Sequence, residues 1–354
     1  MALARDWLAA LDEQLVCGNY AGPDPYDALT SPILRRLPSS LLRRIATQSV
    51  KRSPVDLRAM LRVRPVRMAK TLGLVAGSLA MAPWLPAASE RRAALAQDLR
   101  DARNSDGGWG YEFDVEMRWG GYPAGSSNIV ATAFVVDGLR KGGCDDQISS
   151  TAAGFIESQL SRGDYIAYAA SSDALIHNAN LLGAVTLQRL VPGHPLVRAS
   201  LHTTLGAQRP DGTWPYGQGP RTAWVDSFHT GYVLQALLEL ENAHPEVADS
   251  LERGIDAWLR EGFSMRGPRY YLGRDDGPLD VHNIATSLSV LARLAPKREL
   301  ATELLPATLA TLGRLRRSDG TFSARGRGEP YSRWELAHVH RALAEVAALK
   351  KEAL

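Results

Sequence analysis

Three histidines of this chain stand where apolar helices are expected to begin. His177, His229 and His282 each open such a run, at steps of 52 and 53 residues. The positive potential of a helix N-terminus disfavours charged imidazole, so these rings should be neutral at pH 7. A neutral imidazole can accept a proton, as general-base catalysis requires. His177 and His229 are therefore the preferred catalytic residues, and His282 is a candidate for substrate binding.

An aspartate precedes each of the two preferred histidines. Asp173 stands four residues before His177, and Asp226 stands three residues before His229. A carboxylate so placed could orient the imidazole and stabilise its protonated form. It could equally cap the helix by accepting hydrogen bonds from backbone N–H groups. The sequence leaves both roles open.

A further pair of carboxylates lies in the loop expected over 104–127. Asp114 and Glu116 alternate with apolar residues, so both would project to the same side of an extended segment. Two such carboxylates could perform acid–base work on a glycosidic bond. Alternatively, Asp114 only pairs with Arg118. Asp114 is kept as a catalytic candidate on the first interpretation.

Aromatic and polar side chains gather in the expected loops and helix starts. Aromatic faces stack on sugar rings, and they also line cavities that stabilise carbocations. Buried amides favour a sugar, because an apolar terpene would leave each one unpaired at a cost of roughly 1 to 3 kcal/mol. The predicted substrate-binding residues are Trp109, Tyr122, Asn128, Asn178, Asn180, Trp214, Tyr216, Trp224, Tyr271, His282, Asn283 and Trp334, accompanied by Trp119, Gln218, Phe228, Thr230, Tyr270, Tyr331 and Arg333.

A metal site is the alternative use of the histidines. The three histidines and Asp226 are ligand types suited to zinc, but they stand on separate expected helices with no His-x-x-x-His pair. Cys17 and Cys144 supply neither a disulfide framework nor a four-ligand zinc site. We therefore predict no metal, no cofactor and a reducing compartment.

The elements that must position these residues repeat along the chain. Asn128, His177, His229, His282 and Trp334 follow one another at steps of 49, 52, 53 and 52 residues, a period that fits one helical hairpin. Inner helices rich in Ala, Leu, Val and Gly are expected at 70–81, 128–140, 177–190, 229–241, 282–294 and 333–348. Helices of mixed character, suited to an outer layer, are expected at 90–103, 146–161, 195–208, 246–262 and 298–316. We predict an all-α fold, an (α/α)6-type toroid or six-hairpin barrel, with the polar residues at one mouth.

Long loops connect the outer helices to the inner ones. They are expected at 104–127, 162–176, 209–228, 263–281 and 317–332. Long loops on one face of a repeat array usually carry function. No strand signal covers enough chain for a sheet, so short hairpins within these loops are the most that is expected.

The N-terminal part of the chain is strongly basic. Residues 35–70 carry eleven Lys and Arg against Asp56 (11 − 1 = +10), whereas the whole chain carries +3. Such a surface could attract an anionic membrane or a diphosphate, or its arginines could pair with acids elsewhere in the fold. No nucleic-acid motif accompanies the charge. We predict a basic helical extension over 1–65, with helices at 1–20, 31–50 and 54–62, packed on a toroid domain over 66–354.

The first helix also bears on localisation. Asp6, Asp12 and Glu13 interrupt its apolar residues, which indicates an amphipathic helix rather than a signal peptide. No uncharged apolar run approaches the roughly 18 residues of a membrane span. A cytoplasmic protein is expected, with peripheral attachment at the inner membrane face left open.

Three of the expected loops begin with the same turn signal. Asp106-Gly107, Asp211-Gly212 and Asp319-Gly320 are each followed by an aromatic residue that can fold back over the preceding outer helix. The second copy, Gln208-x-x-Asp-Gly-x-Trp214, resembles the repeat of squalene and terpenoid cyclases and related α/α toroids. The resemblance runs from about residue 65 to the end and implies the fold. It does not choose an activity, because toroids host hydrolases, lyases, epimerases and cyclases.

Departures from these families narrow the activity. Class II terpene cyclases use an Asp-x-Asp-Asp cluster, and the nearest approaches are Asp275-Asp276 and Asp280. Protein prenyltransferases hold zinc with Asp, Cys and His, and neither cysteine adjoins a helix-start histidine. The pattern is also similar to proteins of bacterial capsule and exopolysaccharide gene clusters, in the segments 25–29, 122–125, 177–184 and 228–231. That resemblance implies sugar metabolism.

Three functions follow for this sequence. The preferred one is an epimerase or lyase that transfers protons on a sugar or uronic acid in bacterial polysaccharide biosynthesis, through His177 or His229, on a sugar, glycan or lipid-linked sugar. The second is a terpenoid or prenyl diphosphate cyclase, which predicts a deep, dry, aromatic cavity. The third is a non-catalytic glycan-binding or assembly protein, which predicts a shallow mouth with all three histidines used as caps.

Overall fold

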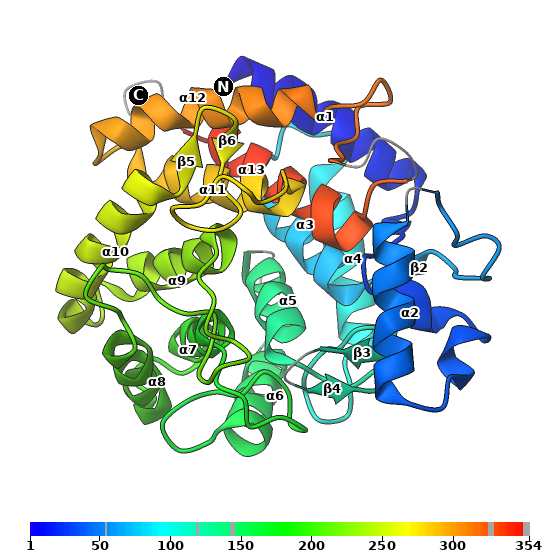
Figure 1. The fold of residues 1–354 in the computed structure, drawn as a ribbon, viewed down its shortest axis with the longest axis horizontal. Coiled ribbons are helices and arrows are strands. Elements are labelled where there is room, and N and C mark those ends of the chain that lie inside the picture. Colours follow the sequence, from blue (N-terminus) through cyan, green and yellow to red (C-terminus); the bar gives the residue numbers. More distant parts are fainter. Residues whose placement is uncertain (54, 118–119, 142–145, 325–328, 350–354) are drawn as a thin grey trace.

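Two concentric rings of helices make up the protein (Figure 1). The structure is a computed structural model that describes residues 1–53, 55–117, 120–141, 146–324 and 329–349. The inner ring consists of α3 (Ala69–Met81), α5 (Ile129–Lys141), α7 (His177–Leu190), α9 (Ser227–Leu240), α11 (Val281–Leu294) and α13 (Ala337–Ala347). Each inner helix packs on the next, and α13 packs on α3, which closes the ring. The predicted α/α toroid is confirmed.

Six further helices surround this ring. They are α1 (Ala2–Cys17), α4 (Ala88–Asp101), α6 (Asp146–Phe155, continued by the π turn η3, Ile156–Leu160), α8 (Pro195–Gly206), α10 (Ala248–Glu261) and α12 (Glu299–Arg314). Helix α1 packs on α13 through one apolar face made of Ala4, Leu8, Leu11 and Leu15. The N-terminal helix therefore occupies an outer-ring position, and the domain boundary at residue 65 stays a prediction.

Inner helices α3 and α5 approach each other at a pair of glycines. A Cβ added to Gly73 would stand 2.6 Å from the carbonyl oxygen of Phe134, and one added to Gly138 would stand 2.3 Å from the carbonyl oxygen of Gly73. Both obstacles are backbone atoms, which cannot turn aside as a side chain can. The absence of side chains at these positions allows the two helices to pack.

Replacing Gly73 with alanine is expected to destabilise the protein by roughly 1 to 3 kcal/mol, because the two helices must separate to admit the methyl group. Gly154→Ala is the matched control, since nothing lies within 4 Å of its Cβ position and it too stands in a helix. That change should stabilise by roughly 0.5 to 1 kcal/mol. Urea denaturation followed by circular dichroism measures both. Equal effects would show that the close approach has no energetic weight.

The turns predicted at the three Asp-Gly pairs are confirmed. Gly107, Gly212 and Gly320 adopt φ values of 91°, 86° and 89°, which favour glycine. The aspartate before each glycine accepts a backbone N–H two residues ahead, at 2.9 Å in every copy. Trp109 and Trp214 then donate their indole N–H to Leu99 and Thr204, carbonyls in the last turns of α4 and α8. The aromatic residues therefore cap outer helices.

Three pairs of two-residue strands accompany the helices among the described residues, and two of them are hairpins within the predicted loops. The three pairs join β1 (Ala21–Gly22) with β2 (Val66–Arg67), β3 (Val115–Glu116) with β4 (Gly121–Tyr122), and β5 (Phe263–Ser264) with β6 (Gly267–Pro268), all antiparallel. The first pair joins both ends of the segment 21–67. The other two lie in loops above the inner ring.

The basic segment contains one helix, α2 (Ser40–Arg52), where two were predicted. Ser31 accepts hydrogen bonds from Ile33 and Leu34 N–H and forms a local turn, so only the short helix η2 (Leu34–Arg36) follows it. Pro38 then disfavours helix in the residue before it, and Ser39 caps the new start by accepting from Leu42 N–H at 3.2 Å. Residues 57–62 contain turns instead of the predicted helix over 54–62.

The remaining short helices are η1 (Asp27–Thr30), η4 (Pro245–Val247) and the π turn η5 (Ser332–Leu336), which leads into α13.

Among the described residues, no helix combines the length and the apolar character needed to cross a bilayer. Cys17 is exposed, and Cys144 lies outside the described residues.

Candidate active site

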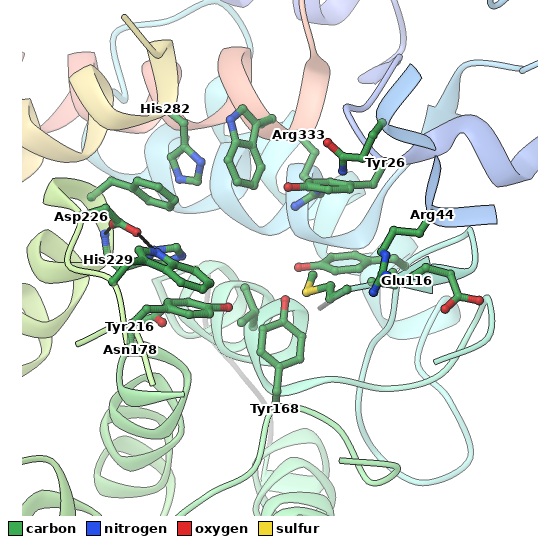
Figure 2. A pocket seen from close by; sticks show the side chains of 18 of the residues that line it. Tyr26, Arg44, Glu116, Tyr168, Asn178, Tyr216, Asp226, His229, His282 and Arg333 are labelled. Atoms are coloured by element: carbon green, nitrogen blue, oxygen red, sulfur yellow. Dashed lines mark hydrogen bonds and ion pairs between the residues drawn. The ribbon is translucent and has the colours of Figure 1, made fainter. Parts of the chain in front are cut away.

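One cavity at the mouth of the toroid is lined by the beginnings of all six inner helices (Figure 2). Its volume is about 1230 Å³. The helix starts contribute Lys70, Val130, Asn178, His229, His282 and, from η5, Trp334. Helix α2 forms part of the rim through Arg44, Ile45 and Arg52. The long loops between outer and inner helices complete the wall, as their length indicated.

Tyrosines dominate the wall of this cavity. Seven of them line it, namely Tyr26, Tyr111, Tyr168, Tyr216, Tyr232, Tyr270 and Tyr271. Each combines an aromatic face with a hydrogen-bonding hydroxyl. Phe113, Phe228 and the two tryptophans Trp224 and Trp334 complete the aromatic surface. The wall is aromatic and polar at once, unlike the dry cavity that the cyclase alternative predicts.

Asp226 and His229 form a hydrogen-bonded pair in the wall. The Asp226 Oδ2 atom lies 2.6 Å from His229 Nδ1 and also accepts the Trp224 indole N–H at 2.9 Å. The other oxygen of Asp226 accepts the His229 backbone N–H at 2.8 Å, as an N-cap of α9. Both roles that the sequence left open for Asp226 are therefore present together. With the carboxylate on Nδ1, Nε2 is the nitrogen left to exchange a proton with a substrate.

Aromatic rings fix the plane of this imidazole. His229 lies between Tyr216 and Phe228, at centroid distances of 4.3 and 3.9 Å, and Tyr216 stacks on Trp224 at 4.7 Å. Figure 2 shows Tyr216 and His229 side by side on the cavity wall, with Asp226 behind. The His229 side chain remains 20% exposed, whereas that of Asp226 is 2% exposed. Both residues line the cavity, and His229 is the more accessible of the two.

His282 forms part of a different cluster, below His229. Its Nε2 lies 2.7 Å from the Tyr232 hydroxyl, which also lies 3.2 Å from His338 Nδ1, and the two imidazoles stack at 3.9 Å. Burial lowers the pKa of both His282 and His338 well below the usual range, so both are neutral. His282 reaches the cavity floor, but its Nε2 is already engaged.

His177 faces away from the cavity. Its Nδ1 lies 3.3 Å from Thr204 Oγ1 on the outer helix α8, and the residue is 1% exposed. Asp173 does not orient it, because that side chain is 86% exposed and pairs with Arg162 at 2.7 Å. The structure therefore provides no second imidazole–carboxylate pair at this position, and the expected pairing of His177 with His229 across the site does not occur.

The buried His177 makes stability depend on pH. Burial lowers the pKa of His177 from 6.5 to about 4. Between these values the unfolded chain binds more protons, so the stabilisation is complete above about pH 6.5 and is lost as the pH falls towards about 4. The expected slope approaches about 1.4 kcal/mol per pH unit. His177→Gln should reduce the change in unfolding free energy between pH 4 and 6.5, as measured by urea denaturation, and the exposed control His202→Gln should not. Equal pH dependence in both variants would contradict the role of His177.

The loop carboxylates Asp114 and Glu116 form ion pairs with arginines of the N-terminal segment. Asp114 lies 3.4 Å from Arg35 and accepts Ala124 N–H at 2.8 Å, outside the cavity lining. Glu116 lines the rim, where it binds Arg43 at 2.7 Å and accepts the Ser40 hydroxyl at 2.7 Å. Both carboxylates therefore tie the N-terminal segment to the β3–β4 hairpin. The expected Arg118 partner and Trp119 lie outside the described residues.

The other predicted substrate-binding residues divide into two groups. Those that line the cavity are Asn178, Tyr216, Trp224, Tyr271, His282 and Trp334. Those that do not line it are Trp109, Tyr122, Asn128, Asn180, Trp214 and Asn283. The amides of the second group hold backbone in place: Asn128 accepts Ala131 N–H, Asn180 accepts Ile166 N–H, and Asn283 donates to the Arg269 carbonyl, each at 2.9 Å.

The sequence missed several lining residues. Tyr26, Tyr111, Tyr168, Tyr232 and Lys70 were not predicted there. Tyr111 follows the first Asp-Gly turn, and Lys70 begins the inner helix expected at 70–81. Their positions in the repeat could therefore have placed both residues at the cavity. Tyr26 comes from a segment outside the repeat, which no periodicity could place.

Comparisons with known proteins support the fold. No protein-family model and no curated protein match the chain. Among solved structures, cellobiose 2-epimerase from Bacillus thermoamylovorans is similar with a TM-score of 0.59 and 11% identity, covering 80% of this chain and 89% of that one. A type II terpene cyclase from Scytonema has a TM-score of 0.53 and 16% identity, covering 79% and 88%. The ent-copalyl diphosphate synthase from Streptomyces platensis has a TM-score of 0.52 and 19% identity, covering 86% and 55%.

These likenesses define the class to which the fold belongs, the α/α toroids that include terpene cyclases and a sugar epimerase. At such identities they show the fold alone. The chemistry must be inferred from the residues of the cavity.

Proposed function

We propose that this protein is an acid–base enzyme that acts on an acidic sugar, such as a uronic acid, by moving the proton on the carbon next to the carboxylate. The observation that carries the proposal is the Asp226–His229 pair in the wall of the cavity. His229 Nε2 would take the proton, and Asp226 would stabilise the imidazolium that forms. The similarity to capsule-cluster proteins supports a place in bacterial polysaccharide biosynthesis.

The number of accessible imidazoles bears on the reaction. Epimerisation requires an acid or base on each face of the substrate carbon, whereas an elimination can begin with one base. His177 faces α8 and His282 is bonded to Tyr232, so His229 is the imidazole placed to act. A lyase-type elimination therefore fits these residues better than an epimerisation. His229 Nε2 takes the proton, the bond between the next carbon and its oxygen substituent breaks as the double bond forms, and the leaving oxygen takes up a proton from the imidazolium or from solvent.

The cavity wall favours a sugar over a hydrocarbon. Asn128, Asn180 and Asn283 bond to backbone, so they no longer support a sugar. Asn178 provides a polar group in the cavity lining instead, because its Oδ1 is buried without a hydrogen-bond partner among the described residues. A hydrocarbon would cover this amide without hydrogen-bonding it, at roughly 1 to 3 kcal/mol. A sugar ring can stack on Tyr216 and bond through its hydroxyls.

A terpenoid cyclase is the second candidate, favoured by the aromatic surface of Phe113, Phe228 and Trp334. Its proton donor would be Asp280. Burial raises the pKa of Asp280, and the Trp334 indole N–H contacts its Oδ2 at 3.3 Å. A carboxyl with a raised pKa holds its proton more readily, as alkene protonation requires, and Asp280 reaches the cavity lining through Trp334. The two candidates therefore depend on different residues, His229 and Asp280.

A thermal-shift panel separates these functions. Uronic acids, nucleotide sugars and polyprenyl diphosphates are offered to the wild type, to His229→Ala and to the exposed control His202→Ala. A ligand at 100 times its Kd adds about 2.7 kcal/mol, which raises Tm. We expect the rise with acidic sugars, weakened in His229→Ala and unchanged in His202→Ala. A rise with polyprenyl diphosphates alone would favour the cyclase, and none at all would favour the non-catalytic alternative.

We further propose that the rim of the cavity rests on an anionic membrane. Large exposed apolar residues gather in the segment 33–60, namely Ile33, Leu41, Leu42, Ile45, Val55 and Met60. Exposed arginines stand among them, at 35, 36, 52, 62 and 64. Apolar side chains that enter a bilayer beside arginines that attract its lipid headgroups are typical of a peripheral membrane surface. A lipid-linked sugar could then reach the cavity from the membrane.

Replacing Met60 with glutamate is expected to weaken binding to vesicles that contain phosphatidylglycerol by about tenfold, since the loss of one buried apolar side chain is worth about 1.5 kcal/mol. Leu300→Glu, on the outer helix α12, is the matched control because Leu300 is also exposed. Co-sedimentation measures both. Equal binding to pure phosphatidylcholine vesicles, or equal loss in both variants, would contradict a membrane surface at this segment.

A further inference from the structure

A buried lysine reaches the floor of the cavity. Lys70 stands in the first turn of α3, is 3% exposed and lines the cavity. Its Nζ lies 4.5 Å from the centre of the Phe134 ring. Within the described part of the chain, no carboxylate forms an ion pair with it and no hydrogen bond to its Nζ occurs. The amine is therefore buried, directed at the cavity and without an anionic partner.

Asp24, an acid whose charge acts on Lys70, is already paired. Asp24 accepts two hydrogen bonds from Arg333, at 2.7 and 2.8 Å, and both residues are buried. Lys70 thus faces one neutralised pair, Asp24 with Arg333, and two neutral imidazoles, His282 and His338. Burial, and then the nearby Arg333, lowers the pKa of Lys70 well below its usual range. This environment therefore disfavours the charged form of the amine.

The charges at the floor select the ligand. With Lys70 protonated, Lys70, Arg333 and Asp24 sum to +1. The N-terminus of α3 is already met by Glu112, whose Oε1 accepts the Ala69 N–H at 3.2 Å and whose pKa burial raises to about 7. One carboxylate would neutralise this site, whereas a diphosphate would bring excess negative charge into a buried region. An apolar side chain at position 70 would avoid the cost of burying an amine without a partner. An anionic ligand would pair with the protonated amine of Lys70. Binding such a ligand would explain why a lysine stands at this buried position.

We propose that Lys70 binds the carboxylate of the ligand, so that the cavity holds a monoanionic acidic sugar with its carboxylate against the first turn of α3. This deepens the proposed function and rests on it for the choice of a sugar. Binding takes up a proton, because the anion pairs with the charged amine. The carboxylate subsite is separate from the Asp226–His229 pair, and His282 stands in the same floor.

Isothermal titration of D-glucuronate and of neutral D-glucose tests this subsite. Titrations at pH 7.5 in two buffers of different protonation enthalpy measure proton uptake. The wild type should bind glucuronate at least tenfold more tightly than glucose, with uptake of a proton. Lys70→Met should lose that tenfold and the uptake, while glucose affinity changes less than twofold. Lys297→Met, an exposed lysine, should match the wild type.

Several outcomes would overturn the proposal. They are unchanged glucuronate affinity in Lys70→Met, equal affinity for both sugars in the wild type, or tighter binding of inorganic pyrophosphate than of glucuronate. Melting curves check the fold, and Lys70→Met should melt no lower than the wild type because it removes a buried amine. These measurements require no turnover. Binding through Lys70 without any proton exchange at carbon would leave this subsite standing and contradict only the proposed reaction.

Discussion

His229→Ala is expected to lower turnover of an acidic sugar by about 10² to 10⁴, because a positioned general base contributes that factor. The fold should survive, since the side chain is 20% exposed and no other element depends on its Nε2. Asp226→Asn should give a loss of similar order. Asparagine caps a helix as well as aspartate does, so this variant keeps the start of α9. It replaces Oδ2 with an amide NH2 and so removes both the charge and the acceptor of the Trp224 indole N–H beside His229 Nδ1.

Steady-state rates of four variants measure this prediction. His202→Ala, an exposed residue of the outer helix α8, should keep the wild-type rate. Asp280→Asn preserves the cap of α11 and should also keep it. The opposite pattern, with turnover abolished by Asp280→Asn and spared by His229→Ala, would assign proton donation to Asp280 and favour a cyclase.

Asp24→Asn is expected to destabilise the protein by roughly 3 to 5 kcal/mol, the largest effect on stability that we predict. It leaves the guanidinium of Arg333 buried without its charge partner. Arg333 is 3% exposed and Asp24 is fully buried, and the two bonds between them measure 2.7 and 2.8 Å. The Arg58 guanidinium also donates to the Asp24 carbonyl at 2.9 Å. Asp24 therefore connects Arg333 and Arg58 to the loop that contains it.

Urea denaturation measures this loss. The exposed pair of Arg274 and Asp276 is the control, and Arg274→Gln should leave the denaturation midpoint unchanged. The double variant Asp24→Leu with Arg333→Met should be less destabilised than Asp24→Asn, because it leaves no buried charge. If Asp24→Asn unfolds at the wild-type midpoint, the pair does not hold the N-terminal segment to η5.

The helix register explains why spacing alone misplaced His177. His177 is the first residue of α7, His282 is the second of α11, and His229 is the third of α9. Each step along a helix turns the side chain by about 100°. Histidines about 52 residues apart therefore point in different directions, and only His229 reaches both the cavity and a carboxylate. Relative to the helix starts, Asn128, Asp226 and Asp280 are the equivalent positions, directly before each helix.

The toroid itself was predictable because its signals are local. Apolar runs, Asp-Gly turns and the repeat period each report on neighbouring residues, and the inner helices begin within a few residues of the predicted starts. The N-terminal segment depends on contacts between distant residues. Asp24 meets Arg333 across 309 positions, and Glu116 meets Arg43 across 73. No periodicity encodes such pairs, so Tyr26 and α2 could not be placed at the cavity from sequence.

The basic charge of residues 35–70 has more than one use. Arg43 and Arg67 pair with Glu116 and Asp98, which fastens the segment to the toroid, and Arg58 pairs with Asp27 within the N-terminal segment. Arg44 and Arg52 line the rim of the cavity, and Lys70 reaches its floor. Of the two interpretations offered by the sequence, pairing within the fold holds for Arg43, Arg58 and Arg67, and attraction of anions by the other members of the run stays a prediction.

Deuterium exchange tests the central proposal most directly. The protein is incubated in D2O with oligosaccharides that contain uronic acids, and NMR follows the proton on the carbon next to the carboxylate. We expect the wild type and His202→Ala to exchange that proton or form the unsaturated product, and His229→Ala to do so at least a hundredfold more slowly. Exchange as fast in His229→Ala as in the wild type, or none in the wild type with any acidic sugar, would contradict a general-base role for His229.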